Sequence, residues 1–184
     1  YSSSSNSIDK IYFETASELG KTIAERKDIL LFGGGMCGLM GATASSAHKT
    51  GGRVIGVIPE ALNQKGIVYE TCDELIITED MRKRKSVMDA RSDAFIALPG
   101  GYGTLEELLE IITLKQLKYH NKPIVILNVN GYFDSLLKQF DNIAKEQFAR
   151  PESSLLYHVA TDVSEALDYI DTYKPFEFKD KWLT

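Results

Sequence analysis

The sequence predicts a single-domain α/β fold in which helices cover both faces of one doubly wound parallel sheet. Short runs of β-branched and aliphatic residues are nearly all apolar rather than alternating, which is typical of strands buried on both faces. Stretches with helical periodicity alternate with these runs, and two of the runs are followed directly by glycine-rich loops. This alternation favours right-handed crossovers and therefore parallel strands.

The expected strands, in chain order, are residues 29–32, 54–58, 75–78, 94–98 and 124–127, with a weaker candidate at 155–159. The expected helices are residues 8–26, 39–50, 80–90, 104–117, 132–148 and 162–173. We expect one domain over residues 1–173 and a C-terminal tail over residues 174–184, docked by Trp182. A parallel sheet normally opens with a buried strand, and the serine run that follows Tyr1 predicts that at most the last residue of such a strand is present.

The 184-residue chain has an ordinary globular composition, with 43% hydrophobic and 26% charged residues. Its 21 Lys and Arg against 26 Asp and Glu give a net charge of −5, which provides no basic field for nucleic acid. No apolar run reaches the roughly 18 residues of a membrane span, and no signal-peptide pattern opens the chain. Cys37 and Cys72 lack disulfide or metal spacing, and neither they nor the three histidines predict a metal site. We therefore expect a cytoplasmic domain that binds a small molecule, without nucleic acid, membrane, metal or other cofactor.

The first glycine-rich loop, at residues 33–41, contains GxGxxG between an expected strand and an expected helix. Backbone N–H groups at such a turn can bind phosphate or ribose oxygens, since no side chain blocks the approach. The acidic partner of a dinucleotide site would be Glu60, which fits poorly behind Pro59. A wall that contacts a nucleotide, with Gly34 and Gly35 in it, is favoured over a turn that only packs tightly.

The second glycine-rich loop, at residues 99–103, precedes a helix whose N-terminal N–H groups and dipole point at the loop. Such a loop suits a monophosphate, and the absence of GxxxxGK[ST] disfavours ATP hydrolysis. Thr104 and Glu107 also have the spacing of a capping box, which would only stabilise the helix. Both roles stay open.

The third feature is a basic segment with an arginine on an apolar helix face. Arg84 shares its face with Met81 and Met88, so it is expected to point inward and to find an anion there. Of its neighbours Arg82, Lys83 and Lys85, two are expected to be solvated.

These residues carry a family resemblance. The signature PGGxGTxxE is complete from Pro99 to Glu107, and MxxRK falls on Met81, Arg84 and Lys85. The chain resembles the LONELY GUY (LOG) family of cytokinin riboside 5′-monophosphate phosphoribohydrolases, often mislabelled lysine decarboxylases. The resemblance runs almost from end to end, and includes GGGxxGLMG at residues 33–41 and the segment at residues 128–132.

The resemblance implies a Rossmann-like fold, a homodimer, and cleavage of an N6-modified adenosine 5′-monophosphate into free base and ribose 5-phosphate. It implies that Arg84 and Glu107 form the catalytic pair. It also implies that the nucleotide is lined by Met81, Lys85, Gly100, Gly101, Tyr102, Gly103, Thr104, Leu105 and Glu106, with Glu74 as a further contact. Leu114 and Lys115 stand where the family has Trp-Ala.

The chemistry agrees with those residue types. A carboxylate near C1′ can stabilise an oxocarbenium-like transition state and orient the attacking water, which suits Glu107. Arg84 stays protonated and suits an electrostatic clamp rather than a proton shuttle. The alternative is a non-catalytic carrier of a nucleotide or of molybdopterin cofactor on the same fold, which has no need of both residues.

Overall fold

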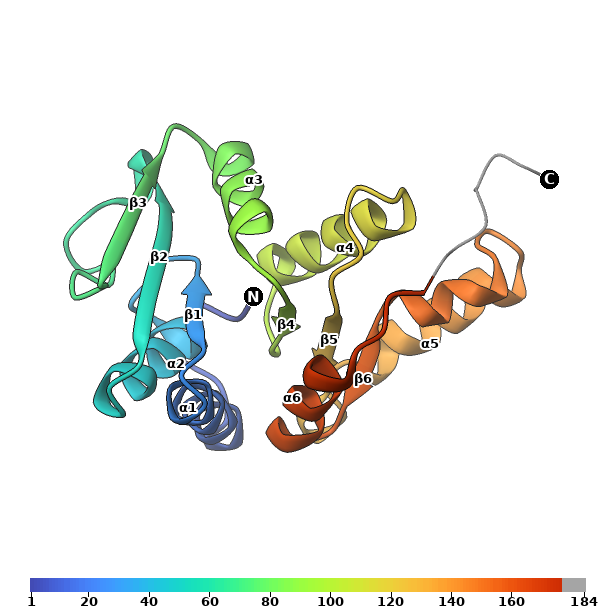
Figure 1. Cartoon of the computed structure of the whole chain (residues 1–184), viewed down its shortest axis with the longest axis horizontal. Helices are drawn as coiled ribbons and strands as arrows, with labels where there is room; N and C mark the ends of the chain where they lie inside the picture. The colour runs from blue at the N-terminus through green and yellow to red at the C-terminus, as the bar shows by residue number, and fades with distance from the viewer. Residues whose placement is uncertain (177–184) are drawn as a thin grey trace.

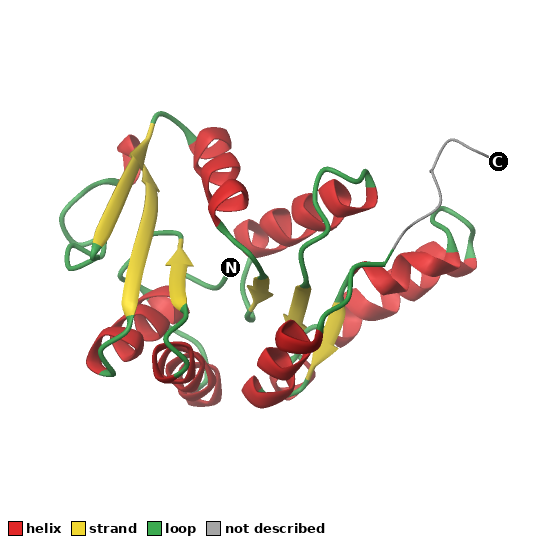
Figure 2. Ribbon diagram, viewed as in Figure 1, coloured by secondary structure: helices red, strands yellow, loops and turns green. Residues whose placement is uncertain are grey.

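The structure is a computed structural model that describes residues 1–176, and strands and helices alternate along it (Figures 1 and 2). The helices are α1 (Lys10–Glu25), α2 (Gly38–Lys49), α3 (Met81–Arg91), α4 (Tyr102–Gln116), α5 (Asp134–Lys145) and α6 (Val163–Thr172). The strands are β1 (Ile29–Phe32), β2 (Arg53–Pro59), β3 (Glu74–Thr78), β4 (Phe95–Ala97), β5 (Ile124–Leu127) and β6 (His158–Ala160). Short 3-10 helices are η1 (Glu60–Leu62), η2 (Val129–Gly131) and η3 (Pro151–Leu156).

All the pairs among strands β1 to β6 are parallel, in the orders β1-β2-β3 and β4-β5-β6. The N-terminal residues lie beside β4, where Leu98 N–H donates to the Tyr1 carbonyl at 2.9 Å and Ser3 N–H donates to the Pro99 carbonyl at 3.1 Å. The N-terminus lies between the two halves in Figure 1, and a cavity of about 520 Å³ separates β1 from β4.

Two hydrophobic cores cover the two faces of this arrangement, as the doubly wound fold requires. Helices α1, α2 and α6 form one core, and α4 and α5 form the other. Strand β5 alternates between them, because Val125 and Leu127 face the first core while Ile124 and Ile126 face the second. The predicted α/β class and its helices on both faces are confirmed. The single sheet that was predicted is instead divided into two three-stranded sheets, because β1 and β4 are not paired with each other.

Most predicted boundaries differ from the structure by one to three residues. Helix α4 begins at Tyr102 with Gly101 as its N-cap, two residues before the predicted start. The last strand begins at His158 rather than at residue 155, because Pro151 starts a 3-10 helix that continues to Leu156. Helix α5 ends at Lys145, three residues short of its predicted end.

No helix within residues 1–176 has the length and apolar content needed to cross a bilayer. Trp182 lies outside the described residues, so its predicted docking stays a prediction, as does the division at residue 173.

Candidate active site

Arg84 points from α3 into the protein, as predicted from its methionine neighbours. The helix starts where Asp80 caps it, with the side-chain Oδ1 accepting from the Lys83 N–H at 2.7 Å. Arg84 lies one turn further on and is only 7% exposed. Its Nε donates to the Val57 carbonyl at 3.0 Å, which places the guanidinium over the carboxyl end of β2.

Glu107 supplies the anion that a buried arginine requires. Arg84 Nη1 donates to Glu107 Oε1 at 2.7 Å, and the glutamate is itself 8% exposed. The ion pair joins α3 to α4 across residues 23 positions apart in sequence. A charge-assisted bond in a low-dielectric site fixes both groups in direction as well as in distance.

The first glycine-rich loop packs directly against this pair. A Cβ atom on Gly33 would lie 1.9 Å from Nη2 of Arg84, so only glycine lets the guanidinium lie where it does. Gly34 has a φ of +73°, a conformation that side chains rarely adopt. The loop therefore forms a wall behind Arg84.

The helix that follows this loop offers little to a phosphate. At the start of α2, Gly38 N–H donates to Asn6 Oδ1 at 2.8 Å and Leu39 N–H donates to the Ser3 carbonyl at 2.9 Å. These donors are the ones that a dinucleotide fingerprint uses for pyrophosphate. The N-terminal segment occupies them instead, which weakens a dinucleotide interpretation of GxGxxG.

The second loop leaves its donors available. The N–H groups of Tyr102, Gly103 and Thr104, in the first turn of α4, find no acceptor within residues 1–176. Gly101 and Gly103 face open space, where a Cβ would meet no atom within 4 Å. Tyr102 is 94% exposed beside them. An anion can therefore reach the positive end of the helix.

The capping-box interpretation of Thr104 and Glu107 is wrong. Because α4 begins at Tyr102, Thr104 lies inside the first turn and Gly101 is the N-cap, without a side-chain bond. The Glu107 carboxylate is bonded to Arg84 rather than turned back to the helix start. The Glu107 carboxylate therefore pairs with Arg84 and does not cap the helix.

Lys85 and Glu106, both predicted to line the nucleotide, are paired with each other beside the buried pair. Lys85 Nζ contacts Glu106 and also Glu110, the latter at 2.7 Å. A cavity of about 270 Å³ opens here between α3 and α4, with Glu107 in its wall. Its charged and polar lining is Tyr1, Arg82, Lys85, Ser86, Asp89, Glu107 and Glu110.

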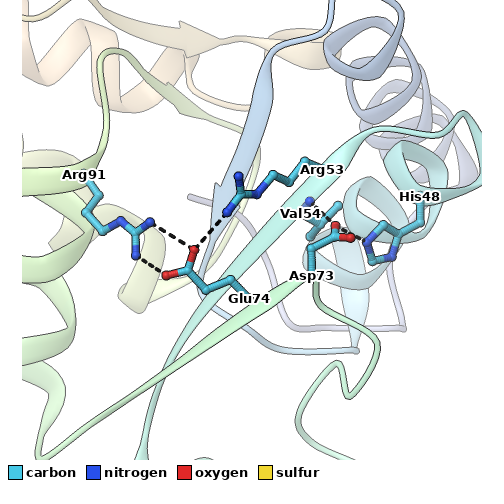
Figure 3. Close-up of polar contacts among 6 residues, drawn as sticks. All are labelled: His48, Arg53, Val54, Asp73, Glu74 and Arg91. Carbon is cyan, nitrogen blue, oxygen red and sulfur yellow. Dashed lines mark hydrogen bonds and ion pairs between the residues drawn. The ribbon is translucent and has the colours of Figure 1, made fainter.

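Glu74 is the predicted contact that the structure does not bring to this cluster. It begins β3, at the end of the strand opposite to the loops that carry the site. Arg91 grips its carboxylate with both guanidinium Nη atoms, and Arg53 Nη2 lies 3.3 Å from Oε2 (Figure 3). The hydrogen bond from Arg91 holds the pKa of Glu74 below its usual value. Met81, also predicted, is half-exposed at the start of α3.

The sequence did not predict two contacts of the site. The Val57 carbonyl that orients Arg84 is a backbone group and leaves no trace in sequence. The Tyr132 hydroxyl donates to the Gly100 carbonyl at 2.7 Å and so buttresses the second loop. Its only signal was that it belongs to the segment 128–132, which resembles the LOG family.

The fold and the site together define an α/β protein with a buried arginine–glutamate pair and a glycine-rich anion loop at the carboxyl ends of its strands, where such folds bind ligands. The family model described as "Possible lysine decarboxylase" matches residues 40–170. The chain is 45% identical over 172 residues to probable cytokinin riboside 5′-monophosphate phosphoribohydrolase LOGL2 of Oryza sativa subsp. japonica, covering 94% of this chain and 70% of the relative. It is 42% identical to LOG5 of Arabidopsis thaliana, covering 94% and 75%. The chain belongs to the LOG family of cytokinin riboside 5′-monophosphate phosphoribohydrolases.

Solved structures share the fold at lower identity. A molybdenum cofactor carrier protein from Chlamydomonas reinhardtii superposes with a TM-score of 0.69 at 27% identity, covering 93% of this chain and 92% of its own. The molybdenum cofactor binding protein from Rippkaea orientalis gives 0.68 at 25% identity, covering 90% of each chain.

Proposed function

We propose that the protein hydrolyses the N-glycosidic bond of adenosine 5′-monophosphate or an N6-modified form of it, releasing the free base, a cytokinin where the adenine carries the N6 group, and ribose 5-phosphate. The observation that carries this proposal is the buried Arg84–Glu107 pair beside the open first turn of α4. The activity named for its relatives agrees with that pair.

The second loop would hold the phosphate through the N–H groups of Tyr102, Gly103 and Thr104. Phosphate held there places the sugar toward Glu107, one turn along the same helix. Binding energy from the phosphate thereby positions the reacting carbon.

Glu107 would orient the attacking water and stabilise the cationic ribose, while Arg84 fixes the carboxylate. The water oxygen bonds to C1′, the C1′–N9 bond breaks with its electron pair leaving on the base, and one water proton ends on the released base. Arginine remains charged throughout and shuttles no proton.

Further site residues belong to this proposal. Lys85 and Glu106 line the sugar side, and Met81 with Gly34 and Gly35 form the surrounding wall, as do Gly100, Gly101 and Leu105. A contact between Glu74 and the nucleotide stays a prediction. In the structure the Glu74 carboxylate is paired with Arg53 and Arg91 instead.

We also propose a homodimer, because apolar side chains are exposed along α4 and at its end: Leu109 is 42% exposed, and Leu117, the C-cap residue, is 38% exposed. The free thiols of Cys37 and Cys72 favour a cytoplasmic location.

The direct test is to incubate the protein with AMP, with isopentenyladenosine monophosphate and with the two matching nucleosides, and to measure free base. We expect turnover of the nucleotides and little or none of the nucleosides, because the α4 turn has nothing to bind without phosphate. Equal rates on nucleoside and nucleotide would contradict the proposal. Tight binding of either nucleotide without release of base would favour the carrier.

A further inference from the structure

A chain of polar side chains lies behind the first glycine-rich loop and has no part in the proposed chemistry. His48, near the end of α2, contacts the Tyr69 hydroxyl through Nδ1 at 3.0 Å and Asp73 Oδ2 through Nε2 at 2.9 Å. Asp73 Oδ2 also accepts the Val54 N–H at 2.7 Å (Figure 3). The His48 side chain is largely covered, with its ring stacked on that of Tyr69.

The hydrogen-bond directions follow from Asp73. The hydrogen bond from the Val54 N–H, and to a smaller extent the one from His48, holds the pKa of the Asp73 carboxyl below its usual value. This carboxylate therefore only accepts hydrogen bonds. Nε2 of His48 must therefore carry a proton. In neutral histidine Nδ1 then accepts the Tyr69 hydroxyl hydrogen, and in protonated histidine it donates to the hydroxyl oxygen.

The chain ends on a segment that pairs with the glycine-rich loop. Met36 N–H donates to the Ile67 carbonyl at 2.8 Å, and Tyr69 N–H donates to the Gly34 carbonyl at 2.8 Å. Gly35 and Val68 form an antiparallel bridge between these two bonds. Residues 67–69 thus form a short backing strand behind the loop.

The same loop contacts Arg84 on its other side. Gly33 leaves room for Nη2 of Arg84 that even a methyl group would remove. A shift of the loop by a fraction of an ångström therefore reaches the guanidinium directly. Because Arg84 is bonded to Glu107, the disturbance passes to the carboxylate as well.

The backing strand needs support from outside itself. It lies in the long connection from residue 60 to residue 73, between β2 and β3, most of which is exposed. Long connections lose considerable entropy when held in one conformation. Val68 is the buried member of the strand, and the Tyr69 ring packs edge-on against Phe32. The hydroxyl bond to His48 adds a fixed direction to those non-directional contacts.

We propose that His48, Tyr69 and Asp73 are positioning residues, which hold residues 67–69 against the glycine-rich loop and thereby set the orientation of Arg84. The inference rests on the proposed function for its kinetic readout, and on amide exchange for a readout that is independent of it.

The experiment compares Tyr69→Phe, His48→Leu and His48→Gln with the wild-type chain. Tyr69→Phe removes one hydroxyl and keeps the ring, and His48→Leu removes both hydrogen bonds. Glutamine presents one acceptor and one donor, as neutral histidine does, and cannot titrate. Tyr173→Phe is the matched control, because its hydroxyl bonds to Asn121 Oδ1 at 3.0 Å and does not bond to His48 or to residues 67–69.

Hydrogen exchange is followed by NMR at the amides of Met36 and Tyr69, and kcat and KM are measured with AMP. In Tyr69→Phe and His48→Leu we expect exchange at both amides to rise by about fivefold or more, as the loss of one net hydrogen bond implies. We expect kcat to fall by about tenfold to a hundredfold through misplacement of Arg84, with KM nearly unchanged, because the α4 turn is not touched. His48→Gln should restore both quantities, and Tyr173→Phe should change neither.

Unchanged exchange at Met36 and Tyr69 in both damaging variants would overturn the proposal. So would a His48→Gln variant as impaired as His48→Leu, since packing or charge would then matter rather than the hydrogen bonds. If the wild-type chain releases no base from AMP, the proposed function fails, and the exchange measurements still decide the positioning role.

Discussion

Glu107 is the residue on which both the proposed chemistry and the integrity of the site depend. Glu107→Gln keeps an oxygen that can accept from Arg84 but removes the charge that an oxocarbenium-like transition state would feel. We expect turnover of AMP to fall by roughly a hundredfold or more. The guanidinium is left buried without a counter-charge, so the variant should also be less stable, by about 3 kcal/mol. Rate and thermal unfolding on the same sample measure both effects.

Glu106→Gln is the matched control, since Glu106 is the adjacent glutamate on the same helix, more than half-exposed and paired with Lys85. The free energy of unfolding of Glu106→Gln should differ from that of the wild type by less than about 1 kcal/mol. A Glu107→Gln variant with normal turnover would contradict the catalytic role and favour a purely structural ion pair.

Lys115 is buried without an ion-pair partner. It is 1% exposed, its Nζ has no hydrogen-bond partner within residues 1–176, and it lies 4.6 Å from the centroid of the Tyr173 ring. Burial lowers the pKa of Lys115 to about 8, from 10.5. Between those values the unfolded chain binds more protons than the folded chain, so this residue makes stability rise with pH.

We expect the wild-type chain to gain stability relative to Lys115→Met from about pH 8 to 10.5, by at most about 1.4 kcal/mol per pH unit. Denaturant unfolding of both chains across this range measures the difference. The exposed Lys145→Met is the control and should track the wild type. A difference that does not change with pH would show that Lys115 has an ordinary pKa.

At the scale of elements, the first turn of α4 connects helix formation to ligand binding. Gly103 lies in that turn with open space around it, so Gly103→Ala should fold normally and stabilise the helix by up to about 1 kcal/mol. The added methyl group would occupy the space proposed for phosphate. We therefore expect KM for AMP to rise by about tenfold or more, with the melting temperature unchanged or higher.

If Gly103→Ala leaves the KM for AMP unchanged, the proposal that phosphate binds at this turn is wrong. Gly51→Ala is no useful comparison, because Gly51 has a φ of +83° and would be strained by any side chain. Ser164→Ala is the control, because it places alanine in the exposed first turn of a different helix, α6. It should leave the KM for AMP unchanged.

Element positions followed closely from apolar runs, and β1 and β5 match residue for residue. The start of α4 did not, because glycine is a poor helix former and Gly101 and Gly103 were taken for loop. Tertiary contacts decide such ends: the Tyr132 hydroxyl on the Gly100 carbonyl holds the chain in place just before the helix begins.

At the scale of the whole molecule, the exposed apolar residues of α4 predict a homodimer. Leu109→Lys would place a charge on that outer face, where Leu109 is half-exposed. We expect a dimeric mass for the wild type and a monomeric mass for the variant at micromolar concentration, measured by light scattering. Phe148→Lys, at an exposed site beyond α5, should stay dimeric. A monomeric wild type would exclude the proposed interface.

The sequence by itself determined the α/β class, the order of its elements and the two signatures at residues 81–85 and 99–107, because burial periodicity and glycine-rich turns are local properties of the chain. The sequence also predicted that Arg84 would point inward, because Met81 and Met88 lie on the same face of its helix and make that face apolar. Only the tertiary structure decided that Glu107 is the partner of Arg84 and not a cap, that Glu74 is held by Arg53 and Arg91, and that the start of α2 is occupied by the N-terminal segment. Each of these depends on groups distant in sequence that meet only when the sheet is assembled, and backbone donors and acceptors carry no residue signal of where they will be satisfied.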